Sequence, residues 1–428
     1  MADIGEGPVF ERRQVIWPLL VGMTMRILMI TQWFQPEPHF KGLGFAKALQ
    51  AMGHDVEVLT GFPNYPGGKV YPGYRVGLRK REVMDGIPVT RGYIYPSHDS
   101  SALRRIANYV SFALSSTVLA LALRKPDVVY LYTPPMTAAL PAVALRLLRR
   151  VPFVPDVQDL WPDTLAATGM VNNPRVLGLI GWWTQFSLSR AARIVVLSAG
   201  FRQRLLDRGI RVPIAVVHNW APSEIVDVAQ RLPAPHSAAV RPFTILFAGN
   251  MGKAQGLDVV LKAAKTLQSE GSTVRFALIG GGVERGHLKQ LIEDLQLHNV
   301  DLHEPVHPSK MDEVFANADA LLVHLREDPL FEITIPSKLQ AYLAIGRPVI
   351  LGVRGDAADM VRDAKAGVAF DPDSHLGLVA AVKEIAALSP SDRADMGAAG
   401  QSYYNERLAF DIGVAAIERE LCAAAERR

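Results

Sequence analysis

Short apolar runs alternate with longer segments of mixed polarity along most of the chain. The run at residues 26–30 is followed by a glycine-containing loop, a helical pattern over 45–52 that Gly53 ends, and a second run at 56–60. Unbroken apolar runs of this length are typical of parallel strands buried on both faces. The order of strand, glycine loop, helix and strand predicts the opening of a doubly wound, nucleotide-binding-like domain.

The same pattern restarts in the second half. Three prolines fall within residues 230–242, which we interpret as a linker, and a strand at 243–248 follows. A second glycine loop, a helix over 257–269, a strand at 274–279 and a helix over 284–295 complete the repeat. Two α/β units in one chain, the first at 25–220 and the second starting at 221, imply a cleft between them.

Two segments have a pattern of their own. Residues 1–24 read as an N-terminal extension, because acidic residues precede Arg12 and Pro18 interrupts the apolar run 15–23, which favours neither a signal peptide nor a spanning helix. Met25 is an alternative start. The apolar stretch 106–123, with basic residues on both sides, fits either a marginal membrane span or a buried or interfacial helix of the first domain, and we favour the helix.

The amino-acid composition narrows the class of protein and the kinds of ligand to expect. The 428 residues are 49% hydrophobic, which allows two or three domains with sizeable cores. A net charge of +4 suits anionic ligands or an anionic membrane surface and is too weak to indicate nucleic acid. The one cysteine, Cys422, excludes a disulfide framework, offers no metal cluster and indicates a reducing cytoplasm.

The stretch 325–351 carries the strongest candidate chemistry. An acidic loop ends at Pro336, Ser337 is the expected N-cap, and a short helix over 338–344 is closed by Gly346. Backbone N–H groups and Lys338 at a helix N-terminus favour an anion, and a diphosphate is the expected one. The alternative is that these residues merely cap an ordinary helix and that Lys338 is solvated.

Other glycine loops bear on that choice. Gly42 and Gly44 follow the first strand, but a third glycine and a ribose-binding acid are missing, so a dinucleotide site is disfavoured. Lys253 lies on the loop 249–256 and supplies a flexible cation, while the triple glycine 280–282 allows close approach of a ligand to the backbone. Each loop alone fits a tight turn, whereas their recurrence favours a common ligand site.

In the first half, polar residues follow the predicted strand at 153–157. Asp159, Trp161 and Asp163 stand where the carboxyl end of a parallel strand faces a ligand crevice, although Asp163 equally fits the cap of the next helix. The long aromatic loop 61–74 is either functional or a packed surface loop.

As a set, these motifs resemble the group 1 (family 4) glycosyltransferases, in the branch of bacterial capsule, O-antigen and colanic-acid-type pathways. The motifs are Gly249-Asn250 with Lys253 and Gly256-Leu257, Gly280-Gly281-Gly282, Pro336-Ser337-Lys338 with Gly346-Arg347-Pro348, and Asp159-Leu160-Trp161-Pro162. The resemblance implies an α/β GT-B fold of two Rossmann-like, doubly wound domains that face each other across a cleft. It further implies an acceptor-binding domain at 25–220, a nucleotide-sugar-binding domain at 221–405, and a terminal segment, 406–428, that packs back on the first domain.

The resemblance also implies roles for single residues. Lys253 and Lys338 would neutralise the departing diphosphate, while Asp159 would lie near the acceptor or the transferred sugar. Glu332 does not match the register of the family's glutamate pair but is a candidate to serve the donor sugar. The residues implied in donor binding are Gly42, Gly44, Gly249, Asn250, Gly280, Gly281, Gly282, Pro336 and Ser337, and those implied in acceptor binding are His39, Trp161 and Asp163.

The chain departs from the family pattern at three places. The second glutamate of the usual Glu-x7-Glu pair is Ala341 here, the lysine before Gly256 is Gln255, and the His-Asp pair of the first domain is Gln158-Asp159. These changes leave open which residue holds the ribose and which faces the anomeric carbon.

We therefore expect a retaining, metal-independent glycosyltransferase that uses a nucleoside-diphosphate-sugar and no cofactor. The expected acceptor is a glycan on a polyprenyl-diphosphate carrier, reached by a cytoplasmic protein that is peripheral on the inner face of the cytoplasmic membrane. A nucleotide-sugar epimerase of the same architecture and a catalytically inactive nucleotide-sugar-binding protein are the alternatives.

Overall fold

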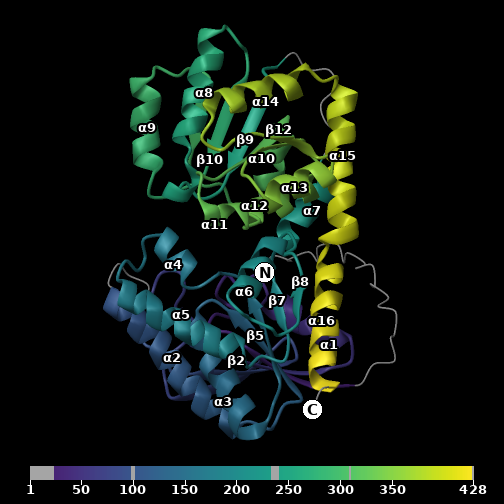
Figure 1. Cartoon of the computed structure of the whole chain (residues 1–428). Coiled ribbons are helices and arrows are strands. Elements are labelled where there is room, and N and C mark those ends of the chain that lie inside the picture. Colours follow the sequence, from purple (N-terminus) through teal and green to yellow (C-terminus); the bar gives the residue numbers. More distant parts are fainter. Residues whose placement is uncertain (1–23, 98–101, 233–240, 308–309, 427–428) are drawn as a thin grey trace, which may run out of the picture.

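A computed structural model describes residues 24–97, 102–232, 241–307 and 310–426. The N-terminal extension, apart from Thr24, and most of the predicted linker lie outside the described residues. The chain forms two α/β domains, one above the other in Figure 1, as the repeated pattern predicted.

The first domain is built on an eight-stranded sheet of order β3-β4-β2-β1-β5-β6-β7-β8. β1 pairs in parallel with both β2 and β5, and only β3 runs antiparallel to its neighbour β4. The strands are β1 (Arg26–Ile30), β2 (Asp55–Gly61), β3 (Arg79–Met84), β4 (Ile87–Gly92), β5 (Val128–Thr133), β6 (Phe153–Val157), β7 (Ile194–Val196) and β8 (Ile214–Val216).

Helices cover both faces of this sheet, which is why its central strands read as continuous apolar runs. Ile27 and Met29 point into a core shared with α1 and α16, while Leu28 and Ile30 point into a core shared with α2 and α3. The helices of this half are α1 (Leu43–Ala51), α2 (Ala102–Ala122), η1 (Met136–Ala138), α3 (Ala139–Arg149), α4 (Asp163–Ala167), α5 (Pro174–Leu188) and α6 (Ala199–Asp207).

The second domain holds a six-stranded parallel sheet of order β11-β10-β9-β12-β13-β14. Its strands are β9 (Thr244–Ala248), β10 (Arg275–Ile279), β11 (Val300–His303), β12 (Ala320–His324), β13 (Val349–Gly352) and β14 (Gly367–Ala369). Its helices are α7 (Ser223–Arg231), η2 (Lys253–Gln255), α8 (Asp258–Ser269), α9 (Arg285–Asp294), α10 (Met311–Ala316), α11 (Pro329–Glu332), α12 (Ser337–Ile345), α13 (Asp356–Asp363), α14 (His375–Ala387) and α15 (Pro390–Arg407).

The last helix, α16 (Phe410–Glu426), crosses back to the first domain. In Figure 1 α15 lies along the upper domain and α16 continues down the lower one. Val414, Ile417 and Leu421 are fully buried in the core of the first domain. The chain therefore completes its first domain with its last helix.

Two local expectations are corrected. Ser337 is the first residue of α12 rather than its cap, because Pro336 takes the extended N-cap conformation. The acidic stretch before it contains the short helix α11, which begins where the Asp328 side chain accepts a hydrogen bond from the Leu330 N–H. Gly346 closes α12 in the left-handed conformation, with φ of 73°, as predicted.

Candidate functional site

Lys338, in the first turn of α12, reaches over the end of β9. Its Nζ lies 3.6 Å from the centre of the Phe247 ring. A Cβ on Gly249 would lie 2.5 Å from the Lys338 Cε, so a side chain at this position would displace the lysine. Burial lowers the pKa of Lys338 to about 7. Within the part of the chain that the structure describes, no carboxylate forms an ion pair with this lysine.

The Lys338 side chain lines a cavity of about 370 Å³ at the carboxyl ends of β9 and β10. This is the size of a small-molecule site, at the edge of a parallel sheet where ligands bind in such folds. The lining residues are Ile225, Ala248, Gly249, Asn250, Ile279, Gly280, Gly281, Pro305, Val306, Met311, Phe315, Lys338, Ala341 and Tyr342. The wall is mainly apolar, with an amide, an ammonium and a phenol as its polar side chains.

The triple glycine has a structural reason that the sequence did not show. A Cβ on Gly280 would lie 1.9 Å from the Gly249 carbonyl oxygen, and one on Gly282 would lie 2.3 Å from that of Met251. Both glycines have φ near +147° (148° and 146°). Close packing of two strand-end turns thus demands these glycines, and Gly281 between them faces the cavity.

Tyr342 joins α12 to the same strand end. Its backbone partner is Ala248, whose N–H donates to the Tyr342 phenol oxygen at 2.9 Å. Sequence reasoning missed this residue because a tyrosine at a buried helical position is ordinarily a core residue.

Lys253 lies on η2, outside the cavity lining, and its side chain is exposed. Gln255, which replaces the family lysine, accepts a hydrogen bond from the Gly252 N–H at 2.8 Å. Gln255 therefore closes its own turn, and Lys253 is the exposed cation of this loop.

On the first domain, the loop after β1 brings His39 beside Tyr132. The two rings meet edge to face at 4.5 Å, and the His39 Nε2 lies 3.3 Å from the Thr31 Oγ1. Burial lowers the pKa of His39 to about 3, so this imidazole is neutral at physiological pH. It can position a hydroxyl group but carries no charge.

Asp159 lies in the same region, since its charge also acts on Tyr132. Burial raises the pKa of the Asp159 carboxyl. Trp161, two residues on, has its ring 6.4 Å from that of Tyr109 on α2. The structure therefore gathers His39, Asp159 and Tyr132 at the end of the sheet of the first domain.

A fully buried ion pair supports this loop. The Lys41 Nζ lies 2.5 Å from the Asp156 Oδ2, and the Tyr130 phenol donates to the same oxygen at 2.7 Å. Neither charged side chain is exposed to solvent. Sequence reasoning missed the pair because its members are 115 residues apart.

Gly42 and Gly44 differ in the space that surrounds them. A Cβ on Gly42 would lie 2.3 Å from the Gln35 side chain, whose oxygen accepts from the Leu43 N–H at 2.8 Å and holds the start of α1. At Gly44 a Cβ would meet nothing within 4 Å. A side chain at Gly42 would thus displace Gln35 from the start of α1, and Gly44 faces open space.

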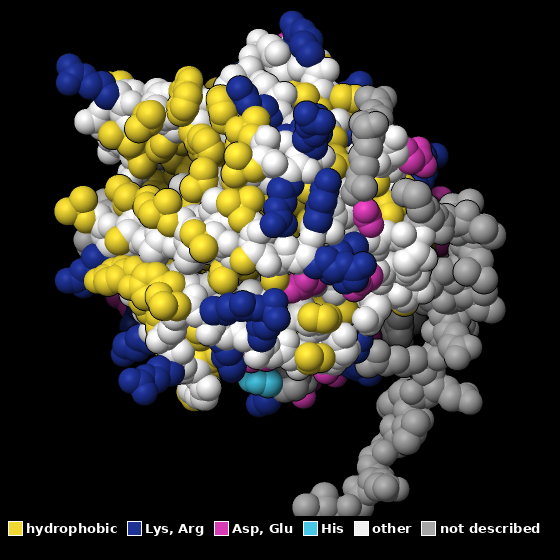
Figure 2. All heavy atoms as spheres, turned by 90° about the horizontal axis from the view of Figure 1, so that it is seen from below, with side chains coloured by type: hydrophobic (Ala, Val, Ile, Leu, Met, Phe, Trp, Pro, Cys, Tyr) yellow, Lys and Arg dark blue, Asp and Glu magenta, His cyan; other side chains and the backbone are white. Residues whose placement is uncertain are grey.

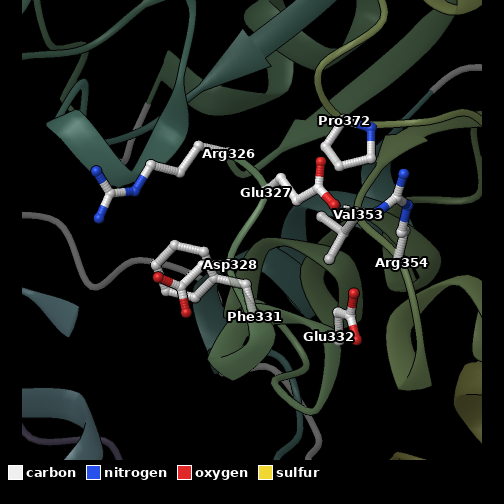
Figure 3. A pocket seen from close by; sticks show the side chains of 8 residues that line it. All are labelled: Arg326, Glu327, Asp328, Phe331, Glu332, Val353, Arg354 and Pro372. Atoms are coloured by element: carbon white, nitrogen blue, oxygen red, sulfur yellow. Dashed lines mark hydrogen bonds and ion pairs between the residues drawn. The ribbon is translucent and has the colours of Figure 1, made fainter.

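Two further candidates lie outside the cavity. Asp163 is the first residue of α4 and forms ion pairs with Arg204 of α6 and with Arg208, the residue that follows this helix, so its carboxylate is already neutralised. Glu332 ends α11 and lines a small hollow of about 10 Å³ in the second domain, shown in Figure 3 with Arg354 and Phe331.

The two domains touch near this hollow. The Ser198 hydroxyl donates to the Ile333 carbonyl oxygen at 2.5 Å, and the Gly200 N–H donates to the Asp356 carboxylate at 2.7 Å. A Cβ on Gly200 would lie 2.4 Å from the Ile333 Cβ, so glycine permits the contact. These bonds connect the two domains at this edge.

One group of side chains among the described residues has a spacing that suits a metal ion: His54, Glu418 and Cys422. The Glu418 carboxylate accepts from the Cys422 thiol at 2.9 Å and lies 3.2 Å from His54. Burial and the hydrogen bond to Glu418 raise the pKa of Cys422 to about 12. The trio links α16 to the first domain.

Of the residues predicted from sequence, the structure brings Gly249, Asn250, Gly280, Gly281 and Lys338 into one cavity. Pro336 and Ser337 begin the helix that carries Lys338. Gly282, Lys253, Glu332 and Asp163 do not line this cavity. Gly42, Gly44, His39, Asp159 and Trp161 belong to the other domain.

Both halves of the chain match glycosyl transferase families in comparisons with known proteins. Residues 43–220 match a family model described as glycosyl transferase 4-like domain, and residues 229–403 match one described as glycosyl transferases group 1. A putative colanic acid biosynthesis glycosyl transferase, WcaI of Escherichia coli (strain K12), is 25% identical over 84% of this chain and 92% of its own length.

Solved structures agree on the fold. Trehalose-6-phosphate from E. coli, bound with UDP-2-fluoro glucose, has 14% identity and a TM-score of 0.69, over 93% of this chain and 99% of that one. Anabaena Alr3699/HepE, in complex with UDP and glucose, has 16% identity and a TM-score of 0.61, over 93% of this chain and 99% of that one. The predicted GT-B fold is confirmed.

Proposed function

This chain belongs to the group 1 glycosyltransferases, and from that membership we propose that it moves a sugar from a nucleoside-diphosphate-sugar to a glycan acceptor. The observation that carries the proposal is Lys338, a half-buried cation without a carboxylate partner among the described residues, at the start of a helix beside a cavity of about 370 Å³. Such a group is complementary to a diphosphate, because burial costs it solvation that an anion restores.

The proposed chemistry is departure of the diphosphate on the face where the acceptor hydroxyl attacks, with retention of configuration. Lys338 opposes the charge that develops on the leaving diphosphate, and Lys253 adds a second cation from its exposed loop. The departing phosphate oxygen can take the proton of the attacking hydroxyl, so no enzyme base and no metal ion are required.

The residues of the first domain are proposed to position the acceptor. His39 is neutral and presents a ring nitrogen, and Asp159 is a carboxyl group whose pKa burial raises. Both suit hydrogen bonds to sugar hydroxyl groups. Gly44 leaves room for the donor sugar, since nothing lies within 4 Å of the position of its missing Cβ.

We further propose that the acceptor is a glycan on a polyprenyl-diphosphate carrier and that the protein works at the inner face of the cytoplasmic membrane. The E. coli relative that carries a colanic-acid biosynthesis description supports a role in cell-surface polysaccharide synthesis. The basic and apolar helices of the first domain support the membrane setting.

A thermal-shift screen against UDP, GDP, ADP, dTDP and CMP tests the donor site. We expect one nucleoside diphosphate to stabilise the protein, and Lys338→Ala to weaken its binding at least about tenfold, in line with the loss of a charge-assisted hydrogen bond. Lys262→Ala, an exposed lysine on α8, is the matched control. Unchanged affinity in Lys338→Ala would show that the diphosphate lies elsewhere.

The matching nucleotide-sugar then separates the alternatives. Transfer to a lipid-linked acceptor, with the anomeric configuration read by NMR and with activity unchanged by EDTA, is the expected result. Conversion of the donor without an acceptor would favour an epimerase, and binding without turnover on any lipid-linked acceptor would favour an inactive binding protein.

A further inference from the structure

Helix α2 carries an exposed apolar stripe along one side. Its stripe residues recur every three or four positions, as on one face of a helix. They are Leu103, Ile106, Val110, Leu114 and Val118, with exposed fractions of 79%, 51%, 43%, 58% and 69%. Soluble proteins rarely leave a row of large apolar side chains in water, so the stripe indicates a partner.

The opposite side of α2 belongs to the protein core. Phe112 and Ala120 are fully buried against the first sheet. Among the described residues, Leu103–Ala122 is the one helical segment long and apolar enough to cross a membrane, and 28% of its most apolar window is buried. A helix that packs into the core on one side is suited to lie along a bilayer surface rather than to span it.

Neighbouring helices continue the apolar surface. Leu147 and Leu148 at the end of α3, and Leu179 and Trp182 on α5, are 57%, 71%, 65% and 60% exposed. Between the three helices lies a groove of about 230 Å³. The groove is lined by Val110, Ala113, Leu114, Thr137, Leu140 and Trp183. We call the exposed side of α2, α3 and α5, with this groove, the lipid face.

The charged side chains of these three helices are all positive. α2, α3 and α5 contain no aspartate or glutamate, and they carry Arg104, Arg105, Arg146, Arg149 and Arg175. Figure 2 shows hydrophobic side chains gathered on the side where Figure 1 places α2 and α5, with Lys and Arg side chains among and around them. An apolar face edged by arginine is complementary to an anionic lipid surface.

We propose that the lipid face docks on an anionic bilayer, with α2 in the plane of the interface and a lipid hydrocarbon chain in the groove. The stripe enters the acyl region, and the arginines pair with lipid phosphates. Because Tyr109 of α2 also lies beside Trp161, docking holds the acceptor side of the cleft at the membrane. The benefit for a lipid-linked acceptor rests on the proposed function, whereas the docking itself does not.

Vesicle flotation of the full chain tests the docking. We expect binding to phosphatidylglycerol–phosphatidylcholine vesicles, at least about tenfold less binding to pure phosphatidylcholine, and release by high salt, since screening weakens surface charge attraction. Leu114→Asp with Val118→Asp should abolish binding. Val283→Asp with Leu376→Asp, at positions that are 81% and 60% exposed in the second domain, should not.

The nucleotide thermal shift of each variant reports folding and the donor site separately. A Leu114/Val118 variant that floats as well as the parent, or a parent that does not float on anionic vesicles, overturns the proposal, whatever the outcome for nucleotides. Equal binding to neutral vesicles overturns the role of the arginines.

Acyl-brominated lipids test the groove. We expect them to quench tryptophan emission, and the quenching to fall in Trp183→Phe but not in Trp33→Phe, a tryptophan of the loop after β1. Equal quenching in Trp183→Phe and the parent places the lipid chain outside the groove and overturns that part of the proposal.

Discussion

At the scale of single residues, the burial of the Lys338 side chain explains why its site should favour an anionic ligand. The sequence showed that Lys338 is a cation at the start of a helix, but it did not show that the side chain is buried. Burial brings its pKa to about 7, so the lysine is half neutral near physiological pH when the cavity is empty. A bound diphosphate favours the charged form and raises this pKa again.

This coupling predicts a pH dependence of binding. Above pH 7 the empty site has lost its proton, and diphosphate binding must take one up, so affinity falls as pH rises, by up to about tenfold per unit between pH 7 and pH 9. The diphosphate identified by the thermal-shift screen should show this slope in calorimetric titrations. In Lys338→Arg, which stays charged, the slope should vanish. A parent protein with flat affinity across this range would mean that Lys338 does not contact the diphosphate.

The glycines also divide at this scale. The strand-end glycines are needed because a second backbone occupies the space of a Cβ, as at Gly280 and Gly282. Gly44 is free of such contacts and remains available to a ligand. The sequence treats these glycines alike, and only the neighbouring atoms tell them apart.

At the scale of elements, the loop between β1 and α1 depends on a contact with β6. Lys41, Asp156 and the Tyr130 hydroxyl form one buried polar group. Removing one member leaves a buried charge without its partner. The loop that presents His39 and Gly42 to the cleft is therefore anchored by electrostatics.

We predict that Lys41→Met lowers the free energy of unfolding by roughly 3 to 5 kcal/mol in urea titrations. The double variant Lys41→Met with Asp156→Leu should lose less than the two single changes added together. Lys47→Met, which breaks the exposed pair with Asp85, serves as the control and should change stability by less than about 1 kcal/mol. A cost for Lys41→Met as small as that of the control contradicts the anchoring role.

Helix α2 shows a different limit of sequence reasoning. Its apolar stretch fitted both a membrane span and an interfacial or buried helix. The described structure shows one side in the core and the other exposed. Asn108 and Ser116 are buried on the core side, where Asn108 accepts from the Gln32 amide and Ser116 donates to the Phe112 carbonyl oxygen of its own helix. The periodicity located the helix, and packing decided which side faces outward.

At the scale of the whole molecule, α16 ties the end of the chain to its beginning. Leu421 is fully buried and lies in the core of the first domain together with Trp220 and Phe45. Contacts from Ser198 and Gly200 to the second domain add a second link. The first domain is therefore incomplete without the final helix.

Leu421→Ala should cost about 2 to 5 kcal/mol, the range for large-to-small changes in a core, and should lower the urea midpoint reported by tryptophan fluorescence. Ile412→Ala, at a 41% exposed position on the same helix, should have little effect. An unchanged midpoint in Leu421→Ala would mean that α16 is not part of the folded core in solution.

The sequence by itself determined the alternation of strands and helices that opens each of the two α/β units, the left-handed glycine that ends α12, and the family. These features depend on local patterns, in which hydrophobic period and turn residues act over a few positions. The tertiary structure alone decided the burial of Lys338, the pairing of Lys41 with Asp156, the neutralisation of Asp163 by Arg204 and Arg208, and the exposed side of α2. Each of these depends on residues that are far apart in the sequence. Only the folded chain brings them together and excludes solvent from the contact, so a local sequence pattern does not reveal them.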